Sequence, residues 1–509
     1  MKSVGQHGPG SFCSRFDIIP RIAYAPALFL ACFVLSASSV FFLPLNHDVS
    51  WLLFLAGEVR GGMRLYADIL EINPPLIVWL TIPVSATAEL AHISAGNLFR
   101  ASVLALALAS IAFAAAILRR RLNHTVELSL LFAACYGAVA LVGYDFGQRE
   151  HLSLLLSMPY LAMAVLRLEL ENTRPSWRMI AAVMASVGFA LKPHFLLVPL
   201  FVEGLVMLKS RSRPDCSSCA IAGAMGLYLA AILAFTPEYL PLVKMLSKVY
   251  GTGYLGASPF AFVWNQNFQL ALISAVAFLW LVRPMPRGIS PVVLAAVLGF
   301  AGAALVQNKG WSYHWYPVAA LCWLLFSLAA AAVISRRQKS VSSAAPIVVG
   351  LVMVTLSAAS LLSAPRKGEA ANPFPALLAP AIQEFGGGPV AIFSNTVRVT
   401  YPLVTQPGIG NSLRRVTAAG MLSAAIRSEN AELETYLRDI IIADIVRYPP
   451  QLLIAEIEPA GLPSSFDFVE YLSRDPVFAH EMTAFRPVTS VANFRFYQRI
   501  KPHVVEAGS

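Results

Sequence analysis

Charged residues are scarce in this sequence. Asp, Glu, Lys and Arg make up 13% of its 509 residues, whereas 57% are hydrophobic. A water-soluble domain needs a polar surface around its core, so this composition excludes a soluble fold for about the first three-quarters of the chain. The net charge of +10 comes from short, scattered clusters of Lys and Arg. Because these clusters form no single basic stripe, the charge does not indicate nucleic-acid binding.

Cysteine is also scarce. The chain has six cysteines and none after Arg366, so no disulfide framework is expected in its C-terminal part. The segment Cys216–Cys219 has the spacing of a zinc or redox pair, but without a second pair we expect neither role. No small-residue cleavage site follows the first apolar run, so we expect that run to remain as an uncleaved anchor. Long internal repeats and low-complexity segments are absent as well.

Long apolar runs, in contrast, recur along the chain. They are Ile22–Leu43, Leu98–Leu118, Val126–Val142, Leu152–Leu166, Met179–Leu191, Phe195–Leu208, Ile221–Phe235, Phe268–Val282, Val292–Val306, Pro317–Ile334 and Ile347–Leu362. A perpendicular span needs about 20 residues, so the shorter runs must include polar neighbours at their ends. We therefore predict an all-α polytopic membrane protein with about 11 transmembrane helices and additional juxtamembrane helices.

Lys and Arg positions predict the orientation of these helices. If each run crosses once, basic clusters occupy every second connection: Lys2/Arg15/Arg21, Arg119–Arg121, Arg167/Arg174/Arg178, Lys209/Arg211/Arg213, Arg283/Arg287 and Arg336/Arg337/Lys339. Such connections are cytoplasmic. The alternation requires that Pro75–Ile93 does not cross, so residues 44–97 are predicted to be an external juxtamembrane loop whose helices lie along the bilayer. Residues 1–21 then form a cytoplasmic N-terminus and residues 22–364 the transmembrane domain.

Residues 365–509 have ordinary polar content and a different pattern. Apolar and alternating segments predict strands at Pro389–Ser394, Gln451–Ile457 and Asn493–Gln498, and helices at Ser412–Tyr436 and Asp467–Leu472. Ser363–Pro375 is predicted to be a linker, and Gly386–Gly388 a turn. Together these segments predict a small extracytoplasmic α/β domain.

Asp48 directly follows the first apolar run, where a carboxylate loses hydration unless a partner is present. An ionisable group in such a place indicates a functional site. Asp48 can also act as the N-cap of a helix that begins at Val49, accepting hydrogen bonds from the backbone N–H groups of Ser50 and Trp51. The two roles are compatible.

Further polar side chains gather in the connections that are predicted to be external. The connection Tyr144–His151 carries Asp145, Arg149, Glu150 and His151. Two other apolar stretches are interrupted by Lys192-Pro193-His194 and by Gln307–Trp315, which contains Lys309, Tyr313 and His314. A single Lys near the end of a span can simply extend to the interface. Three polar clusters on the sparsely charged side indicate a site instead.

Taken in order, these segments form a pattern. A span ending at Asp48 is followed by Glu71–Trp79, by an acidic connection ending at Glu150, by Leu191-Lys192-Pro193 and by Lys309–Pro317. Over about Arg21–Ile334 this order resembles the GT-C glycosyltransferases, especially the branch of the protein O-mannosyltransferases and the bacterial lipid A aminoarabinose transferases. The chain departs from that branch at Val49, where a second acidic residue is usual, and at Ile72, where a basic residue is usual.

The resemblance implies an inverting glycosyltransferase in a bacterial inner membrane. It would move a sugar from a polyprenyl-phosphate carrier to a hydroxyl of an envelope lipid, glycan or protein on the extracytoplasmic face. The catalytic candidates are Asp48, Glu71 and Glu150, with Asp48 as the base that deprotonates the acceptor. The substrate-binding candidates are Asp145, Arg149, Lys192, His194, Lys309, Tyr313 and His314. Lys192, Arg149 and Lys309 would meet the charge of the leaving phosphate.

A divalent cation is optional in this scheme. Asp48, Glu71 and Glu150 offer oxygen ligands for Mg²⁺ or Mn²⁺, and His151 would widen the choice to Zn²⁺. The alternative function is a transporter or flippase of a lipid-linked or polar substrate, in which intramembrane carboxylates couple ions to movement. The one-sided polar clusters and the lack of an inverted repeat argue against transport. A noncatalytic subunit whose tail binds cell-wall components stays open too.

Overall fold

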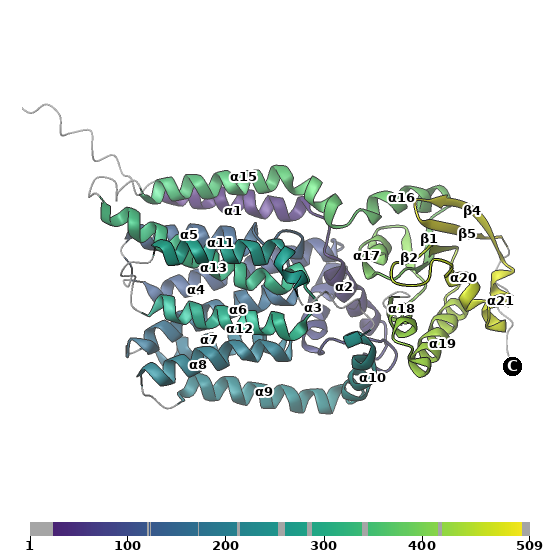
Figure 1. The fold of residues 1–509 in the computed structure, drawn as a ribbon, viewed down its shortest axis with the longest axis horizontal. Coiled ribbons are helices and arrows are strands. Elements are labelled where there is room, and N and C mark those ends of the chain that lie inside the picture. Colours follow the sequence, from purple (N-terminus) through teal and green to yellow (C-terminus); the bar gives the residue numbers. More distant parts are fainter. Residues whose placement is uncertain are drawn as a thin grey trace, which may run out of the picture.

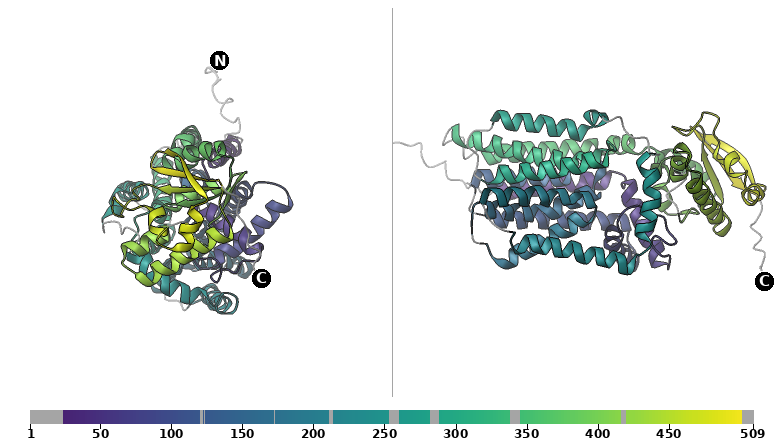
Figure 2. Two further views of the ribbon diagram at one scale, coloured as in Figure 1. Left: turned by 90° about the vertical axis from the view of Figure 1, so that its right-hand side faces the viewer. Right: turned by 60° about the horizontal axis from the view of Figure 1, so that its bottom comes forward.

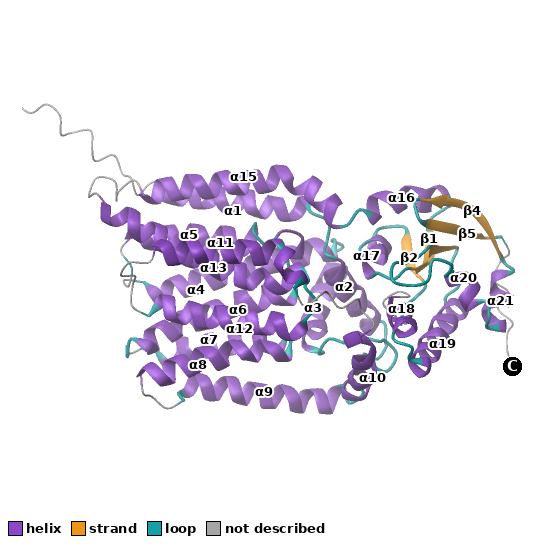
Figure 3. Ribbon diagram, viewed as in Figure 1, coloured by secondary structure: helices purple, strands orange, loops and turns teal. Residues whose placement is uncertain are grey.

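The structure of the protein is a computed structural model that describes residues 24–119, 122, 124–171, 173–210, 214–252, 260–281, 288–337, 345–415 and 420–500. It consists of a bundle of long helices and a smaller C-terminal domain at one end of the bundle (Figure 1). The strands of the described chain lie in the smaller domain (Figure 3). The predicted cytoplasmic segment 1–21 and several of the basic clusters lie outside the described residues.

Each of the predicted apolar runs overlaps a helix of the bundle. The helices are α1 (Tyr24–Phe42), α4 (Ala95–Leu118), α5 (His124–Val139), α6 (Arg149–Leu168), α7 (Pro175–Ala190), α8 (Leu197–Ser210), α9 (Cys216–Phe235), α11 (Gln266–Leu281), α12 (Ile289–Gln307), α13 (Ser312–Arg337) and α15 (Ala345–Ala371). Among the described residues, 8 helices are long and apolar enough to cross a membrane. The shorter helices α5, α7 and α11 have 16 residues each and lie beside them (Figure 1). The protein is an integral membrane protein.

Small residues allow close contacts between these helices. Ser36 of α1 and Ser357 of α15 are both buried, and their hydroxyl oxygens lie 2.9 Å apart. A Cβ atom added to Gly299 of α12 would lie 2.5 Å from Cα of Val198 in α8, so only glycine fits at this crossing. In lipid, where neighbouring tails are as apolar as leucine, such close packing and interhelical hydrogen bonds hold helices together.

Short helices cover the end of the bundle that faces the smaller domain. They are α2 (His47–Arg60), α3 (Leu76–Leu90) and α10 (Tyr239–Thr252), together with the 3₁₀ turns η1 (Gly143–Asp145), η2 (Pro193–Leu196) and η3 (Ala261–Trp264). Figure 1 and the right-hand view of Figure 2 place α10 and its neighbours between the bundle and the smaller domain. The helix α3 lies in this end layer and does not run along the bundle. The orientation scheme requires this position, because α3 falls within the segment Pro75–Ile93 that is predicted not to cross the membrane.

The N-cap of α2 differs from the predicted one. The helix begins at His47, and the Asn46 side chain accepts a hydrogen bond from the backbone N–H of Asp48 at 2.9 Å. The prediction that Asp48 caps a helix starting at Val49 is therefore wrong. Because Asn46 supplies the cap, the Asp48 carboxylate is available for other contacts.

The C-terminal domain contains a five-stranded sheet with the order β2-β1-β3-β5-β4. Its strands are β1 (Gly388–Phe393), β2 (Ile409–Asn411), β3 (Leu452–Glu456), β4 (Phe485–Val491) and β5 (Phe494–Arg499). The strands β2, β1 and β3 run parallel, and β5 and β4 are antiparallel to their neighbours. The helices are α16 (Phe374–Glu384), α17 (Val397–Thr400), α18 (Gly420–Arg427), α19 (Ala431–Arg447), α20 (Phe468–Leu472) and α21 (Pro476–Met482), with the 3₁₀ turn η4 (Leu403–Thr405). The predicted α/β class is confirmed.

Some boundaries in this part of the chain were predicted wrongly. Ser363–Pro375 is not a linker, because α15 continues through Pro365 to Ala371 and α16 begins at Phe374. The segment Ser412–Tyr436 is not one helix, since the chain forms α18 and then α19 after a break at Asn430. The prediction of a turn at Gly386–Gly388 is confirmed, as all three glycines have positive φ angles.

The helix α2 and the loop after it dock the C-terminal domain onto the bundle. The rings of Trp51 and Tyr401 have centroids 5.4 Å apart in an edge-to-face arrangement. The backbone N–H of Leu70 donates to the carbonyl of Arg415 at 2.8 Å. These contacts place the loop after β1 beside the polar end of the bundle.

Candidate active site

A cavity of about 600 Å³ lies between the bundle and the C-terminal domain. From the bundle side it is lined by His47, Asp48, Trp51, Glu71, Ile72, Asn73, Tyr144, Asp145, Arg149, Trp311, Ser312 and Tyr313. From the other side it is lined by Asn395, Thr396, Val397, Arg398, Gly420, Met421 and Arg427, and Ala371 lines it from the end of α15. Its volume is within the range of small-molecule sites, and convergent polar groups in such a cavity mark it as the candidate site.

Asp48 is held in a fixed position on the cavity wall. Its Oδ2 atom accepts hydrogen bonds from Gln148 Nε2 at 2.9 Å and from Arg149 Nη2 at 3.2 Å, while Oδ1 lies 3.7 Å from His47 Nε2. Burial acts to raise the pKa of Asp48, but His47 and Arg149 outweigh burial and hold this pKa below its usual value. The carboxylate is therefore ionised at neutral pH, with one oxygen fixed and the other open to a further partner.

Glu71 also lines the cavity, but both of its carboxylate oxygens are engaged. Oε2 accepts from Trp51 Nε1 at 2.5 Å, and Oε1 accepts from the backbone N–H and the side-chain amide of Asn73 at 2.7 and 2.6 Å. The residue is 2% exposed. These bonds tie α2 to the loop before α3, so Glu71 positions the wall that carries Asp48.

A buried polar group lies beside the cavity without lining it. Lys192 Nζ donates to Glu150 Oε1 at 2.6 Å and to Gln307 Oε1 at 2.9 Å. Burial lowers the pKa of Lys192 to about 8, although Glu150 opposes this change. His314 Nε2 is 3.8 Å from Glu150 Oε1, and neither ring nitrogen of His314 has a hydrogen-bond partner. Tyr313 connects the two regions, because it lines the cavity and its ring centre is 5.4 Å from Lys192 Nζ.

The remaining predicted site residues occupy separate positions. Asp145 lines the cavity and accepts from the Ser312 hydroxyl at 2.7 Å, and burial raises its pKa to about 7. His194 and Lys309 are half-buried and do not line it. They lie in the turns before α8 and before α13, at the same end of the bundle.

The four candidate metal ligands do not come together. His151 accepts from the backbone N–H of Gly147 at 3.0 Å through Nδ1, and its Nε2 lies 2.8 Å from the Ala138 carbonyl, so both nitrogens serve the backbone. Asp48, Glu71 and Glu150 have the partners given above. Across the residues that the structure describes, no group of three or more His, Cys, Asp or Glu side chains could hold a metal ion. This arrangement of the four side chains therefore does not fit the optional cation.

Several cavity residues were not predicted from the sequence. They are His47, Trp51, Tyr144 and Ser312 on the bundle side, and Asn395, Arg398 and Arg427 on the other. Asn395 lies in the loop after β1 and Arg398 in the short helix α17 that comes next, and segments at the carboxyl ends of parallel strands commonly bind ligands. That rule applied to the predicted strand Pro389–Ser394 would have found both. No sequence signal distinguishes Arg427 from other arginines of the domain.

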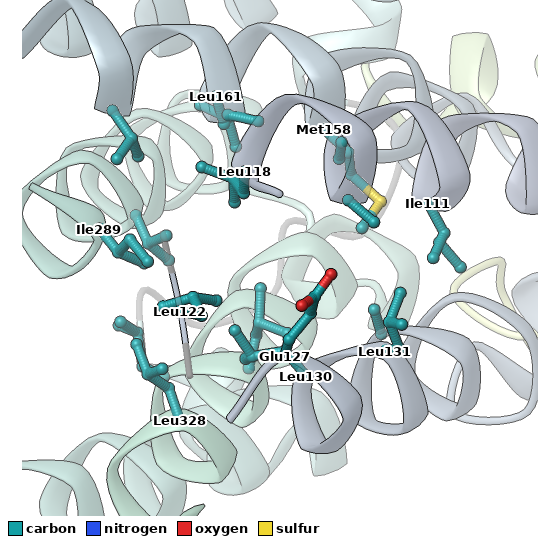
Figure 4. A pocket seen from close by; sticks show the side chains of 18 of the residues that line it. Ile111, Leu118, Leu122, Glu127, Leu130, Leu131, Met158, Leu161, Ile289 and Leu328 are labelled. Carbon is teal, nitrogen blue, oxygen red and sulfur yellow. The ribbon is translucent and has the colours of Figure 1, made fainter. Parts of the chain in front are cut away.

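A second cavity, of about 120 Å³, lies within the bundle and has a different character. It is lined by side chains of α4, α5, α6, α12 and α13 and of Leu122, which are apolar except for Glu127. Figure 4 shows the Glu127 carboxylate pointing into this cavity between leucine side chains. A sugar needs several convergent polar groups, so this cavity is not the candidate active site.

The comparisons with known proteins concern the fold. No protein-family model matches the chain, and no curated protein matches it significantly in sequence. Solved structures do match it, among them ArnT from Cupriavidus metallidurans bound to undecaprenyl phosphate. The identity is 13%, the TM-score is 0.57, and the match covers 94% of this chain and 97% of ArnT. The chain has the GT-C fold.

The GT-C resemblance predicted from the sequence is thus confirmed at the level of the fold. Arabinofuranosyltransferase AftD from Mycobacteria matches over 94% of this chain and 40% of its own length, with 13% identity and a TM-score of 0.41. The oligosaccharyltransferase AglB from Archaeoglobus fulgidus, in complex with an inhibitory peptide and a dolichol-phosphate, matches over 86% of this chain and 70% of its own length. Its identity is 12% and its TM-score is 0.41.

Proposed function

We propose that the protein is an inverting glycosyltransferase that moves a sugar from a polyprenyl-phosphate carrier to an acceptor hydroxyl in the cavity between its two parts. The GT-C fold, which it shares with ArnT bound to undecaprenyl phosphate, supports this class of reaction. The observation that carries the proposal is the ionised Asp48 carboxylate, which Arg149 and Gln148 fix on the wall of that cavity.

In the proposed reaction, Asp48 is the base. The acceptor oxygen attacks the anomeric carbon from the face opposite the phosphate, the bond from that carbon to the phosphate oxygen breaks, and the acceptor proton moves to Asp48. The two hydrogen bonds to Oδ2 leave Oδ1 to receive the proton. A base held in place in this way typically contributes on the order of 10²–10⁴ in rate.

The leaving lipid phosphate needs fixed positive charge. We assign this role to Lys192, Arg149 and Lys309, with His194, Tyr313 and His314 as further contacts and Asp145 on the sugar side. Lys192 and Arg149 are 7% and 4% exposed, so a phosphate beside them would be poorly screened by water and strongly held. Glu150 balances the charge of Lys192 and keeps its side chain in place. We also propose, from the positive-inside rule, that this end of the bundle faces the extracytoplasmic side of a bacterial inner membrane.

Mass spectrometry of envelope lipids and glycans from cells with and without the chain tests this function. A transferase predicts that one glycosylated envelope species disappears without the chain and that a polyprenyl-phosphate sugar accumulates. If the protein is a transporter or flippase, the purified protein forms no covalent product. It instead moves the substrate across a vesicle membrane. Movement without a covalent product would overturn the proposal.

A further inference from the structure

The two walls of the main cavity carry opposite charge. On the bundle side, the carboxylates of Asp48, Glu71 and Asp145 are accompanied by Arg149, which is paired with Asp48. On the domain side, the lining residues include Arg398 and Arg427 and no Asp or Glu. An acidic wall that carries the proposed base therefore faces a basic wall, and this basic wall lies outside the segment Arg21–Ile334 that resembles the GT-C enzymes.

Arg398 has an unmet donor. Its side chain is half-buried, and its Nε atom is buried without a hydrogen-bond partner. A buried donor is normally paired, and leaving one unpaired costs about 1–3 kcal/mol. Guanidinium groups bind phosphate and carboxylate groups through paired, charge-assisted hydrogen bonds. An oxyanion in the cavity would satisfy this donor.

Arg398 lies in the short helix α17, and the loop before this helix is held in place. The loop follows β1 at the carboxyl end of the parallel strands, which is where ligands bind in open α/β sheets. Glu456, at the end of the neighbouring strand β3, accepts from the Ser394 hydroxyl at 2.7 Å and from the backbone N–H of Asn395 at 3.0 Å. The sheet therefore fixes the loop that leads into α17, the helix that carries Arg398, and a binding site requires such support.

The position of these arginines indicates which substrate they contact. A lipid-phosphate donor keeps its tail in the bilayer, so its phosphate stays on the bundle side near Lys192 and Arg149. The wall formed by the C-terminal domain lies across the cavity from that phosphate, so its arginines face the side left for the acceptor. We propose that Arg398 and Arg427 form a second oxyanion subsite that binds a phosphate or carboxylate group of the acceptor. The identification of the ligand as the acceptor rests on the proposed function, whereas the existence of the anion site does not.

The test uses the full-length protein in nanodiscs, saturated with undecaprenyl phosphate so that the donor site is filled. Inorganic phosphate is then titrated at constant ionic strength, and its binding is measured by calorimetry and by thermal shift. The wild type should show a saturable phosphate site. Arg398→Gln and Arg427→Gln should each weaken phosphate binding by about tenfold or more, the usual scale for a lost hydrogen bond to a charged group. Arg398→Lys keeps the charge and should lose less.

The matched control is Arg486→Gln. Arg486 is exposed on β4 at the far edge of the sheet, away from the cavity, so this variant should bind phosphate like the wild type. Thermal melts without ligand check that each variant is folded. Undecaprenyl phosphate affinity should be equal in all of these proteins.

Two results would overturn the inference. Unchanged phosphate affinity in folded Arg398→Gln and Arg427→Gln would show that the arginines bind no anion. A loss of undecaprenyl phosphate affinity in the same variants would assign them to the donor instead. Binding is measured without turnover, so the two proposals can fail separately. If the protein transfers no sugar but keeps an arginine-dependent phosphate site, this result contradicts only the proposed function.

Discussion

The surroundings of Lys192 change its acid–base chemistry. Burial lowers its pKa to about 8, whereas an exposed Lys titrates near 10.4. Below this pKa the side chain is a cation, and above it the side chain is neutral. We therefore predict that undecaprenyl phosphate affinity falls as the pH rises through about 8.

This dependence is measured with binding titrations from pH 6.5 to 9.5, a range chosen to be about 1.5 units either side of the lowered pKa. Lys192→Arg should keep its affinity at the upper end, because Arg stays charged at any of these pH values. Affinity of the wild type that stays constant across the range would mean that Lys192 does not meet the phosphate.

At this scale the sequence identified the residues of the bundle side but not their partners. Asp48, Glu71 and Lys192 were found because a charged residue in an apolar chain is rare and costly. The pairing of Lys192 with Glu150 was not predictable, since they are 42 residues apart in sequence and meet only in the packed bundle. Arg427 could not be identified because arginine is common in a polar domain, whereas Arg398 lies after a predicted strand, where ligands commonly bind.

Among the elements, α6, α8 and α9 are joined by a partly buried ionic cluster. Arg167 donates to Glu203 at 2.7 and 2.8 Å and pairs with Asp215 at 2.9 Å. Arg167→Ala would leave two carboxylates close together without their cation. Removing one partner of a buried pair typically costs about 3–5 kcal/mol, so we predict a large fall in the melting temperature.

Glu203→Gln should cost less, because Asp215 remains to balance Arg167 and the amide can still accept a hydrogen bond. Arg174→Ala serves as the control, since Arg174 is exposed just before α7 and its guanidinium carbon lies 5.5 Å from the centre of the Trp177 ring. Equal melting temperatures for Arg167→Ala and Arg174→Ala would contradict a structural role for the cluster. Thermal melts in one detergent provide the comparison.

The bundle helices were predictable because a bilayer sets the length and composition of an apolar run. The elements of the C-terminal domain were harder. The strand β4 lies at the sheet edge, contains Pro487 and is largely exposed, so it lacks the alternating pattern of a half-buried strand. The helix α15 passes the predicted linker because Pro365 removes one backbone hydrogen bond without ending the helix.

For the whole molecule, the proposed reaction requires both walls of the cavity to lie on one side of the membrane. The orientation scheme predicts that a reporter fused after Gly96 is extracytoplasmic and that one fused after Arg121 is cytoplasmic. Reporter activity or cysteine labelling in intact cells measures this directly. Reversed locations for both reporters would mean that Pro75–Ile93 crosses the membrane and that the positive-inside argument fails here.

The central claim is that Asp48 is the base, and Asp48→Asn tests it most directly. Asn46 still caps α2 in this variant, so the protein should fold and melt nearly like the wild type. Asp68→Asn is the control, because Asp68 pairs locally with Arg64 outside the cavity. With the donor that mass spectrometry identifies, we predict that Asp48→Asn binds undecaprenyl phosphate normally while sugar transfer falls by about two orders of magnitude or more. Normal transfer by Asp48→Asn would contradict the account.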